Sequence, residues 1–394
     1  MRLGIITGEY PPMQGGVGDY SRELARAWVQ QGHEVFVLTD QRATPPIEDS
    51  RIHVQPSVTH WGRWHHRKDR TPRGVLQAIS WVKQHQLEAV NIQYQAAAYN
   101  MHAAANDLPR LLRPYTTVVT TFHDLLFPYL FPKAGPLRKR IVYQMARNSH
   151  GVIVTNLPDE QELRQQGKMP PISRIPIGSN IAASPPEDFE RSLWRTQHLH
   201  VPPEIFLVGY FGFINASKGV DTLAQAIRLL VDRGVNVELL IIGGQTGASD
   251  ATNVEQADIA ERLIGGLGIT QRVHWTGFVE QSLVSANLMA CDVIALPYKD
   301  GVSLRRGTLM AALAHACPIV TTTPQIPIPE LRHGVEAWFV PPEQPAALAE
   351  ALLHLWQDET LRQRLGQNAA LLSKSFEWDN IAGAVTRFIQ QLKR

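Results

Sequence analysis

The sequence predicts two doubly wound α/β domains, each built on a parallel sheet. Three observations support this fold class. Short β-branched runs alternate with helical patterns along the whole chain, as they do in βαβ units. The length of 394 residues is long for one compact core and suits two domains of ordinary size. Hydrophobic residues make up 44% of the chain, which is enough to build packed cores.

The expected strands fall into two series with a link between them. The first series is expected at residues 3–7, 35–39, 89–93, 117–122, 151–155 and 173–177, with a helix over residues 17–31. The second series is expected at residues 206–211, 237–242, 273–276, 293–296, 318–321 and 337–340. Proline-rich stretches at 183–188 and 201–203 are typical of a link, so the first domain is expected to span residues 1–187. Ligands of doubly wound sheets bind at the carboxyl ends of the strands, which predicts a site in the cleft between the domains.

Composition and charge exclude several classes of protein. No apolar run approaches the roughly 20 residues that span a bilayer, and the first strand is too short for a secretory leader. The two cysteines, Cys291 and Cys317, lie in apolar stretches, as expected of buried reduced thiols, so we expect a cytoplasmic protein. Residues 1–187 carry 21 Lys/Arg and 15 Asp/Glu, whereas the remainder carries 17 and 21. No nucleic-acid motif accompanies this asymmetry, which fits contact with anionic lipid or a phosphorylated acceptor, or simply a solvated surface.

A glycine-rich loop follows the first expected strand and opens a helix. It spans residues 9–20 and includes Gly15, Gly16 and Gly18. Glycines let the backbone approach a ligand closely, and the free N–H groups of a helix start favour phosphate. The spacing is not that of a dinucleotide-binding loop, and a tight turn without a ligand is the alternative.

Two further strand-to-helix loops carry charge. In residues 211–221, Lys218 is placed as a point charge suited to a diphosphate, although a lone lysine is more often a surface residue. In residues 297–308, an acid, hydroxyls and two arginines precede an alanine-rich helix, which is the composition of a polar anion site. Adjacent arginines in a loop are also commonly solvated.

These three loops, together with residues 32–35, 121–124, 175–180 and 376–378, resemble the retaining glycosyltransferases of family 4, which have the GT-B fold. The motifs occur in the family's order from Met1 to the C-terminus. The resemblance implies a nucleotide-diphosphate sugar donor held mainly by the second domain, residues 188–375, and an acceptor held by the first. It also implies transfer with retention at the anomeric carbon and no metal or other cofactor. The sequence accordingly contains no Asp-x-Asp pair of the metal-dependent kind.

The resemblance assigns roles to individual positions. Gly15 and Gly16 would lie against the donor phosphates, His123 beside the transferred sugar, and Lys218 on the diphosphate leaving group. The catalytic residues expected are His123, Lys218 and Asp300. The donor-binding residues expected besides these are Gly15, Gly16, Ser303, Arg305, Arg306, Gly307 and Thr308. The acceptor-binding residues expected are Asp19, Tyr20, Trp61, Trp64 and Asp124.

The sequence departs from the family pattern at four positions. Phe213 stands where the family has an arginine, and Ala311 stands where it has the second of two glutamates. Ser303 or Asp300 occupies the place of the first glutamate, depending on the frame, and Ala316 replaces a glycine. Loss of the second glutamate is expected to cost roughly 1.5–3 kcal/mol of donor binding unless it is compensated. We hypothesise that Arg305 and Arg306 replace the missing arginine as diphosphate clamps.

Surface segments bear on the acceptor and on alternatives. Residues 60–68 mix tryptophan with basic residues, which can stack on sugars or hold phosphates, and their histidines lack metal spacing. Residues 125–131 are apolar and precede a basic helix over 137–147, a pattern of peripheral contact with a membrane or of a half-buried helix. Residues 376–394 resemble the family's terminal helix, which crosses back to the first domain.

Three functions remain open from the sequence. The first is sugar transfer in bacterial polysaccharide or envelope glycan synthesis, and the alternatives are a non-catalytic sugar-nucleotide-binding protein and a sugar-nucleotide epimerase.

Overall fold

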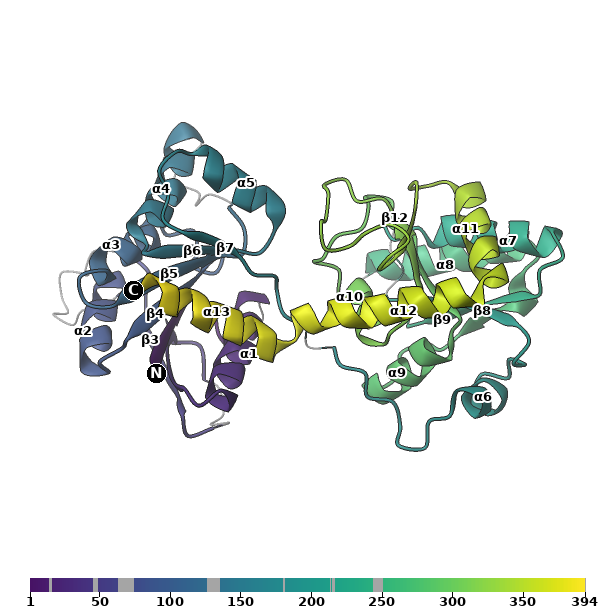
Figure 1. Cartoon of the computed structure of the whole chain (residues 1–394), viewed down its shortest axis with the longest axis horizontal. Helices are drawn as coiled ribbons and strands as arrows, with labels where there is room; N and C mark the ends of the chain where they lie inside the picture. The colour runs from purple at the N-terminus through teal and green to yellow at the C-terminus, as the bar shows by residue number, and fades with distance from the viewer. Residues whose placement is uncertain are drawn as a thin grey trace. The chain divides into compact units, whose positions relative to one another are not determined.

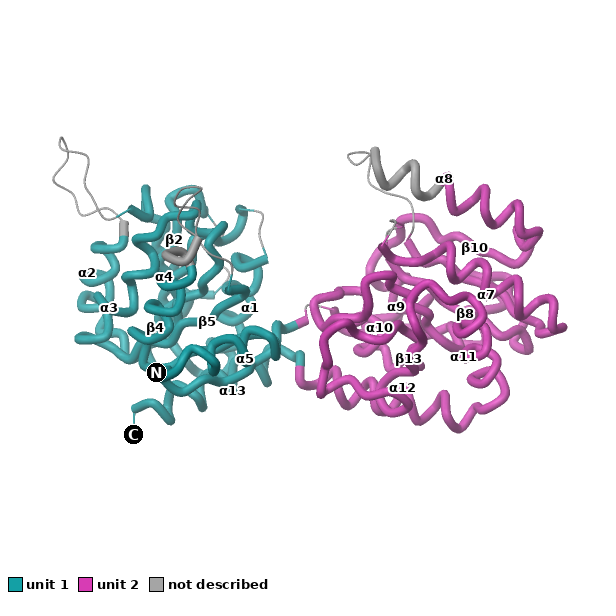
Figure 2. Tube along the Cα trace, turned by 90° about the horizontal axis from the view of Figure 1, so that it is seen from above, with its two compact units in different colours: residues 1–178, 376–394 teal, residues 179–375 magenta. Residues whose placement is uncertain are grey.

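The computed structural model divides into two compact units (Figure 2). Unit 1 comprises Met1–Gly178 and Phe376–Arg394, and unit 2 comprises Ser179–Ser375. Unit 1 therefore ends before the boundary expected at residue 187, because the backbone N–H of Ser184 already donates to the Ser285 Oγ of unit 2 over 3.2 Å. The structure describes residues 1–393 except 14–15, 45–48, 63–73, 126–134, 180, 213, 215–216 and 244–250, and it does not describe the side chains of 74, 135–138 and 251–257.

Unit 1 contains a parallel sheet of seven strands in the order β3-β2-β1-β4-β5-β6-β7. The order reverses at β1, so β1 and β4 flank the switch point at which doubly wound sheets bind ligands. The strands are β1 (Arg2–Thr7), β2 (Glu34–Asp40), β3 (Ile52–Val58), β4 (Ala89–Tyr94), β5 (Thr117–Phe122), β6 (Gly151–Val154) and β7 (Ile172–Arg174).

Helices cover both faces of this sheet. One face packs against α1 and α13 through a cluster that includes Leu24, Trp28 and Ile389 (Figure 1). The indole N–H of Trp28 lies within hydrogen-bonding distance of the Thr386 Oγ1, 3.0 Å, which ties the terminal helix to α1. The other face packs against α2, α3, α4 and α5. The helices are α1 (Gly16–Gln30), α2 (Gln77–Gln84), α3 (Leu108–Leu112), α4 (Gly135–Asn148), α5 (Leu157–Gln165) and α13 (Trp378–Leu392).

Unit 2 repeats the plan with a parallel sheet of six strands in the order β10-β9-β8-β11-β12-β13. The switch point lies between β8 and β11. The strands are β8 (Phe206–Phe211), β9 (Val237–Ile242), β10 (Val273–Trp275), β11 (Val293–Leu296), β12 (Ile319–Thr322) and β13 (Trp338–Val340). The helices are α6 (Arg191–Leu193), α7 (Val220–Asp232), α8 (Ala251–Gly266), α9 (Gln281–Ala290), α10 (Gly307–Ala314), α11 (Pro345–Gln357) and α12 (Glu359–Ser373). Two Rossmann-like α/β domains are thus confirmed.

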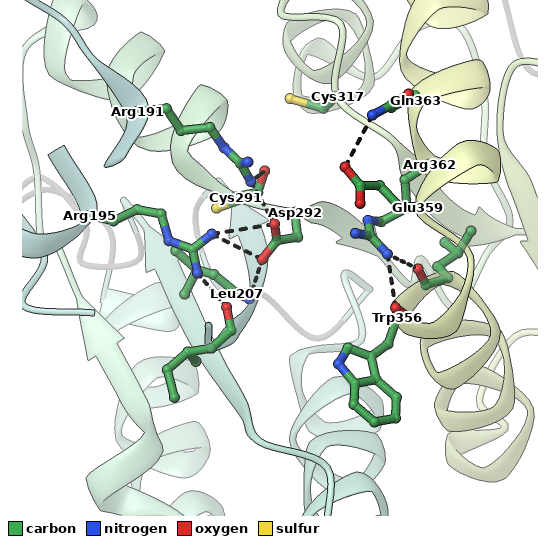
Figure 3. Close-up of polar contacts among 12 residues, drawn as sticks. Arg191, Arg195, Leu207, Cys291, Asp292, Cys317, Trp356, Glu359, Arg362 and Gln363 are labelled. Atoms are coloured by element: carbon green, nitrogen blue, oxygen red, sulfur yellow. Dashed lines mark hydrogen bonds and ion pairs between the residues drawn. The ribbon is translucent and has the colours of Figure 1, made fainter. Parts of the chain in front are cut away.

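An ion-pair network lies at the amino ends of β8 and β11, opposite the edge that binds ligands in such sheets (Figure 3). The Asp292 carboxylate accepts the Leu207 N–H over 2.7 Å, and it pairs with Arg191 at 2.6 Å and with Arg195 at 3.2 Å. The Arg195 side chain is only 3% exposed. This network fastens the segment that enters unit 2 to the sheet, and its role is structural.

Candidate functional site

Two loops at the carboxyl edge of the unit 2 sheet form the first part of the candidate site. One follows β8 and the other follows β11, the strands that flank the switch point. The Lys299 N–H donates to the Ser217 carbonyl over 2.8 Å, which ties the loops together. Gly219 has a φ of +70°, and a Cβ there would lie 2.0 Å from the Pro297 carbonyl oxygen. Glycine is therefore required where the loops meet.

Lys218 lies half-buried in the first of these loops. A Cβ on Gly212 would lie 2.9 Å from the Lys218 Nζ and 2.7 Å from the Thr308 Cγ2, so the amine lies over the Gly212 backbone close to the start of α10. Burial, and then the positive charge of Arg306, lowers the pKa of Lys218 below its usual value. Within the described residues Lys218 makes no ion pair. A partly desolvated cation without a carboxylate partner is suited to bind an anionic ligand.

Arg306 is held beside Lys218 by two contacts. Its guanidinium donates to the Asp300 carboxylate and lies over the Tyr298 ring, 4.5 Å from the centroid. The Tyr298 hydroxyl is 2.6 Å from the Thr308 Oγ1, and burial raises the pKa of Tyr298 to about 12. Arg306 is the N-cap of α10 (Gly307–Ala314), and its side chain does not cap the first amides of that helix. These amides and the two cations converge on one anion-binding corner.

The remaining residues expected in this corner differ in exposure. Arg305 is exposed and makes no ion pair within the described residues, whereas the Ser303 carbonyl accepts the Arg306 N–H over 3.1 Å. Gly307 is exposed as the first residue of α10. Asp300 is exposed too, but its carboxylate is engaged by Arg306, so in this conformation it balances one of the cations.

The structure shows the surroundings of Ala311 and Ala316, two positions at which the sequence departs from the family pattern. Ala311 is fully buried in α10, so no polar side chain occupies the place of the second glutamate. Ala316 adopts a φ of +54°, the left-handed region in which the family's glycine would be unstrained. A Cβ on Gly366 would lie 2.4 Å from the Ala316 carbonyl oxygen, which shows how closely α12 approaches this turn. Phe213 lies outside the described residues.

At the carboxyl edge of the unit 1 sheet, the start of α1 is occupied by a carboxylate of the chain itself. The Glu9 Oε1 accepts the Val17 N–H over 3.1 Å and the Gly18 N–H over 3.2 Å. The amides at the start of this helix were expected to be free for phosphate. Those of Val17 and Gly18 are not, because they already donate to the Glu9 carboxylate, whose charge also offsets the helix dipole. Gly16 is exposed, and nothing lies within 4 Å of a Cβ added there, whereas Gly15 lies outside the described residues.

His123 follows β5 and lies on a chain of buried amides. Its backbone N–H donates to the Tyr94 carbonyl over 3.0 Å, and its Nε2 is 2.9 Å from the Gln93 Oε1. Gln93 in turn donates to the Asn91 Oδ1, and the Asn91 Nδ2 donates to the Thr121 Oγ1 over 2.9 Å. Sequence reasoning missed Asn91 and Gln93. The signal was two amides at alternate positions of an otherwise apolar strand.

Tyr20 packs against His123 from α1. The two rings meet edge to face with centroids 4.7 Å apart, and Tyr20 meets Trp378 of α13 in the same way at 5.1 Å. The Tyr20 hydroxyl is buried and has no hydrogen-bond partner among the described residues, and burial raises the pKa of Tyr20. Asp19, the other residue expected on this helix face, is exposed and lies 3.7 Å from Arg22.

The expectation of a surface-exposed stacking ring at Trp61 is wrong. Trp61 is 1% exposed and packs edge to face on Tyr99 at 4.7 Å, because its indole completes the apolar core under the sheet. Trp64 lies outside the described residues, as do residues 126–131 of the apolar segment expected at a membrane surface. Asp124 directly follows His123, and its Oδ2 accepts the Gln95 Nε2 over 2.9 Å.

The described part of the chain offers neither a metal cluster nor a membrane-spanning helix. No three of its His, Cys, Asp or Glu side chains gather where they could hold a metal ion. Among the described helices, none has the length and apolar character needed to cross a membrane. Both cysteines are free and buried, as expected.

Comparison with known families assigns both units. Residues 14–182 match the family model described as "Glycosyltransferase Family 4", and residues 203–358 match the model described as "Glycosyl transferases group 1". The D-inositol 3-phosphate glycosyltransferase of Xylanimonas cellulosilytica is 26% identical over 94% of this chain and 90% of its own length.

Solved structures share the fold over nearly the whole chain. The Anabaena protein HepE in complex with UDP superposes with a TM-score of 0.71 at 17% identity, over 99% of each chain. Sucrose-phosphate synthase from Thermosynechococcus elongatus superposes with a TM-score of 0.65 at 20% identity, over 99% of this chain and 98% of that one. At these identities the likeness concerns the fold.

Proposed function

We propose that this chain, which is a glycosyltransferase of the GT-B fold with a family 4 domain followed by a group 1 domain, transfers a sugar from a nucleotide-diphosphate sugar to a glycan or lipid-linked acceptor with retention of configuration. The observation that carries the donor assignment is the anion-binding corner of unit 2. Lys218 is half-buried there without an ion-pair partner in the described part of the chain, next to Arg306 and the uncapped start of α10.

This corner fits the electrostatic need of the reaction. Departure of a nucleoside diphosphate places negative charge on phosphate oxygens, and preorganised cations and N–H groups stabilise that charge best where water is excluded. Lys218 would bind the diphosphate directly, and Gly307 and Thr308 would offer backbone amides. Arg306 would bind it when its pairing with Asp300 loosens, and exposed Arg305 would add a longer-range charge.

We assign the transferred sugar to His123 at the carboxyl edge of the unit 1 sheet. His123 is 8% exposed and its Nε2 is bound to Gln93, so the ring acts first as a rigid positioning group. The proton of the acceptor hydroxyl would pass to the departing phosphate. Tyr20 and Asp124 support the His123 ring and loop, and Asp19 at the exposed start of α1 would contact the acceptor.

The acceptor class is proposed from charge. The residues of unit 1 include 24 Lys/Arg and 16 Asp/Glu, which favours a phosphorylated or anionic-lipid acceptor on this unit. Inositol 3-phosphate, named for the Xylanimonas relative, is therefore the first soluble acceptor to test. We further propose that no metal is needed, since Lys218 and Arg306 supply the positive charge that a metal ion would otherwise bring to the diphosphate.

The first experiment is thermal stabilisation by UDP, GDP, ADP and TDP and their common sugar conjugates. A ligand at about 100 times its dissociation constant adds roughly 2.7 kcal/mol to the free energy of unfolding, which is a readily measured shift. Lys218→Met should weaken the stabilising nucleotide about 10- to 100-fold, because charged hydrogen bonds contribute about 1.5–3 kcal/mol. Lys168→Met, a change at an exposed lysine of unit 1, is the matched control.

Turnover then separates the function from its alternatives. Acceptor-dependent consumption of the donor, with an α-linked product from an α-linked donor and no loss of activity in EDTA, is the expected result. Interconversion of the donor sugar without an acceptor would identify an epimerase instead. Tight binding without turnover would identify a non-catalytic sugar-nucleotide-binding protein, consistent with Ala311.

A further inference from the structure

We infer that Gln93 is a positioning residue that, with Asn91, determines which nitrogen of the His123 ring carries the proton. The inference rests on the proposed role of His123. It concerns two neutral amides in the middle of the unit 1 sheet, which belong to no motif singled out in the sequence.

The burial of these amides is the first observation. Gln93 is 0% exposed and Asn91 is 1% exposed, and both lie on β4, whose other residues are mostly apolar. An amide buried without partners costs free energy, so a buried pair is tolerated where its hydrogen bonds are made. Here the bonds run in one line from Asn91 through Gln93 to the His123 ring.

The contacts of Asn91, at the end away from His123, fix the donor and acceptor roles along this line of hydrogen bonds. The Asn91 Nδ2 faces the Val119 carbonyl oxygen at 3.4 Å and the Thr121 Oγ1 at 2.9 Å. A backbone carbonyl can only accept, so turning the Asn91 amide over would bring its oxygen against that carbonyl. Asn91 therefore presents its oxygen to Gln93, and Gln93 presents its nitrogen to Asn91.

The orientation of the Gln93 amide in turn determines the proton position on the His123 imidazole. Because Gln93 uses its amide nitrogen to bind Asn91, its oxygen faces the His123 Nε2 at 2.9 Å, and that nitrogen must be the donor. In the neutral ring the Nδ1 then carries the lone pair. A histidine held by a fixed acceptor has one tautomer and one ring plane, which is the arrangement that second partners impose on functional histidines.

The test measures the tautomer directly and does not depend on turnover. Long-range nitrogen–proton correlation spectra of the full chain with labelled histidine would be compared for the wild type, Gln93→Met and Gln93→Glu, with His123 assigned by its loss in His123→Ala. We expect a single form protonated at Nε2 in the wild type and a mixture of tautomers in Gln93→Met. Gln93→Glu keeps an acceptor oxygen and should keep the Nε2 proton. Thr120→Val is the matched control, since Thr120 is equally buried on β5 but pairs with Ser149.

Kinetics supply the second readout. Gln93→Met should lower kcat about 10- to 100-fold, by analogy with the loss of partners that orient metal-binding histidines, with less than about a twofold change in donor KM. In the His123→Ala background the same change should have no further effect, because Gln93 acts through His123.

An unchanged tautomer in Gln93→Met, or losses that multiply with His123→Ala, would overturn the inference. If Gln93→Met does not fold, Asn91→Leu tests the line from its far end, and an unaltered Nε2 proton there would count equally against it. If no donor and acceptor react even with the wild type, the proposed function fails, while the tautomer measurement still decides the role of Gln93.

Discussion

Replacing Gly219 by alanine tests whether the two anion-binding loops are held together by the close approach of their backbones. Gly219 is the N-cap of α7 and has a φ of +70°, and an added Cβ would lie 2.0 Å from the Pro297 carbonyl oxygen. Gly234 follows the other end of the same helix at a φ of +78°, and nothing lies within 4 Å of a Cβ there. The two glycines share a positive φ and differ in the space around them.

The magnitudes follow from this difference. A left-handed conformation costs an alanine about 1–2 kcal/mol, and the stiffer unfolded chain returns about 0.4–1 kcal/mol, so Gly234→Ala should lose about 1 kcal/mol. Gly219→Ala carries the same loss and must also displace Pro297, for which overpacking costs about 1–3 kcal/mol more. For a unit of this size, each kcal/mol shifts the melting temperature by about 2–4 °C.

The assay is scanning calorimetry of both variants with and without UDP, the nucleotide in the HepE structure. We expect Gly219→Ala to melt lower than Gly234→Ala and to lose nucleotide affinity, because the Lys299–Ser217 hydrogen bond between the loops is displaced with Pro297. Equal melting temperatures for the two variants would refute the reasoning, because the contact with Pro297 would then have no energetic effect.

Three further predictions concern other parts of the chain. Asp292→Ala should cost about 3–5 kcal/mol, since it leaves the buried Arg195 unpaired, whereas Asp232→Ala breaks an exposed helical pair and should cost under about 0.5 kcal/mol in urea unfolding. Folding lowers the pKa of Lys218 below 10.5, so between the two values the unfolded chain binds more protons than the folded chain, and the free energy of unfolding should rise with pH. Lys218→Met should remove this contribution to the slope, and an unchanged slope in urea unfolding would contradict the prediction. Truncation after Ser375 removes α13 and should lower the melting of unit 1, and an unaltered transition would reject its docking on α1.

The predicted strands were confirmed where both faces of a strand are buried, because such strands are short apolar runs in the sequence. The strands expected at residues 89–93 and 206–211 form as β4 and β8, at the switch points of their sheets. The strand β3 (Ile52–Val58) was missed. It contains Pro56 and mixes exposed with half-buried residues, and both features are tolerated because β3 is the edge of the sheet.

The sequence indicated the loops of the candidate site but not the side chains that contact them. Lys218 and Arg306 were singled out because glycines and cations between a strand and a helix are visible in the sequence, and the structure places both near the start of α10, where their role stays a prediction. The capping of α1 by Glu9 and the burial of Trp61 were not foreseen, because each depends on where a side chain turns after the backbone has folded.

The sequence by itself determined the two sheets, the order of their strands and helices along the chain, and the chemical character of the loops at their carboxyl edges. These features depend on the periodicity of apolar residues and on residue types within short stretches of the chain. Only the tertiary structure decided that Asp300 pairs with Arg306, that Gln93 faces His123, and that α13 closes the face beside α1. Such contacts join side chains whose separation is fixed only when the elements pack, and local sequence does not encode those distances.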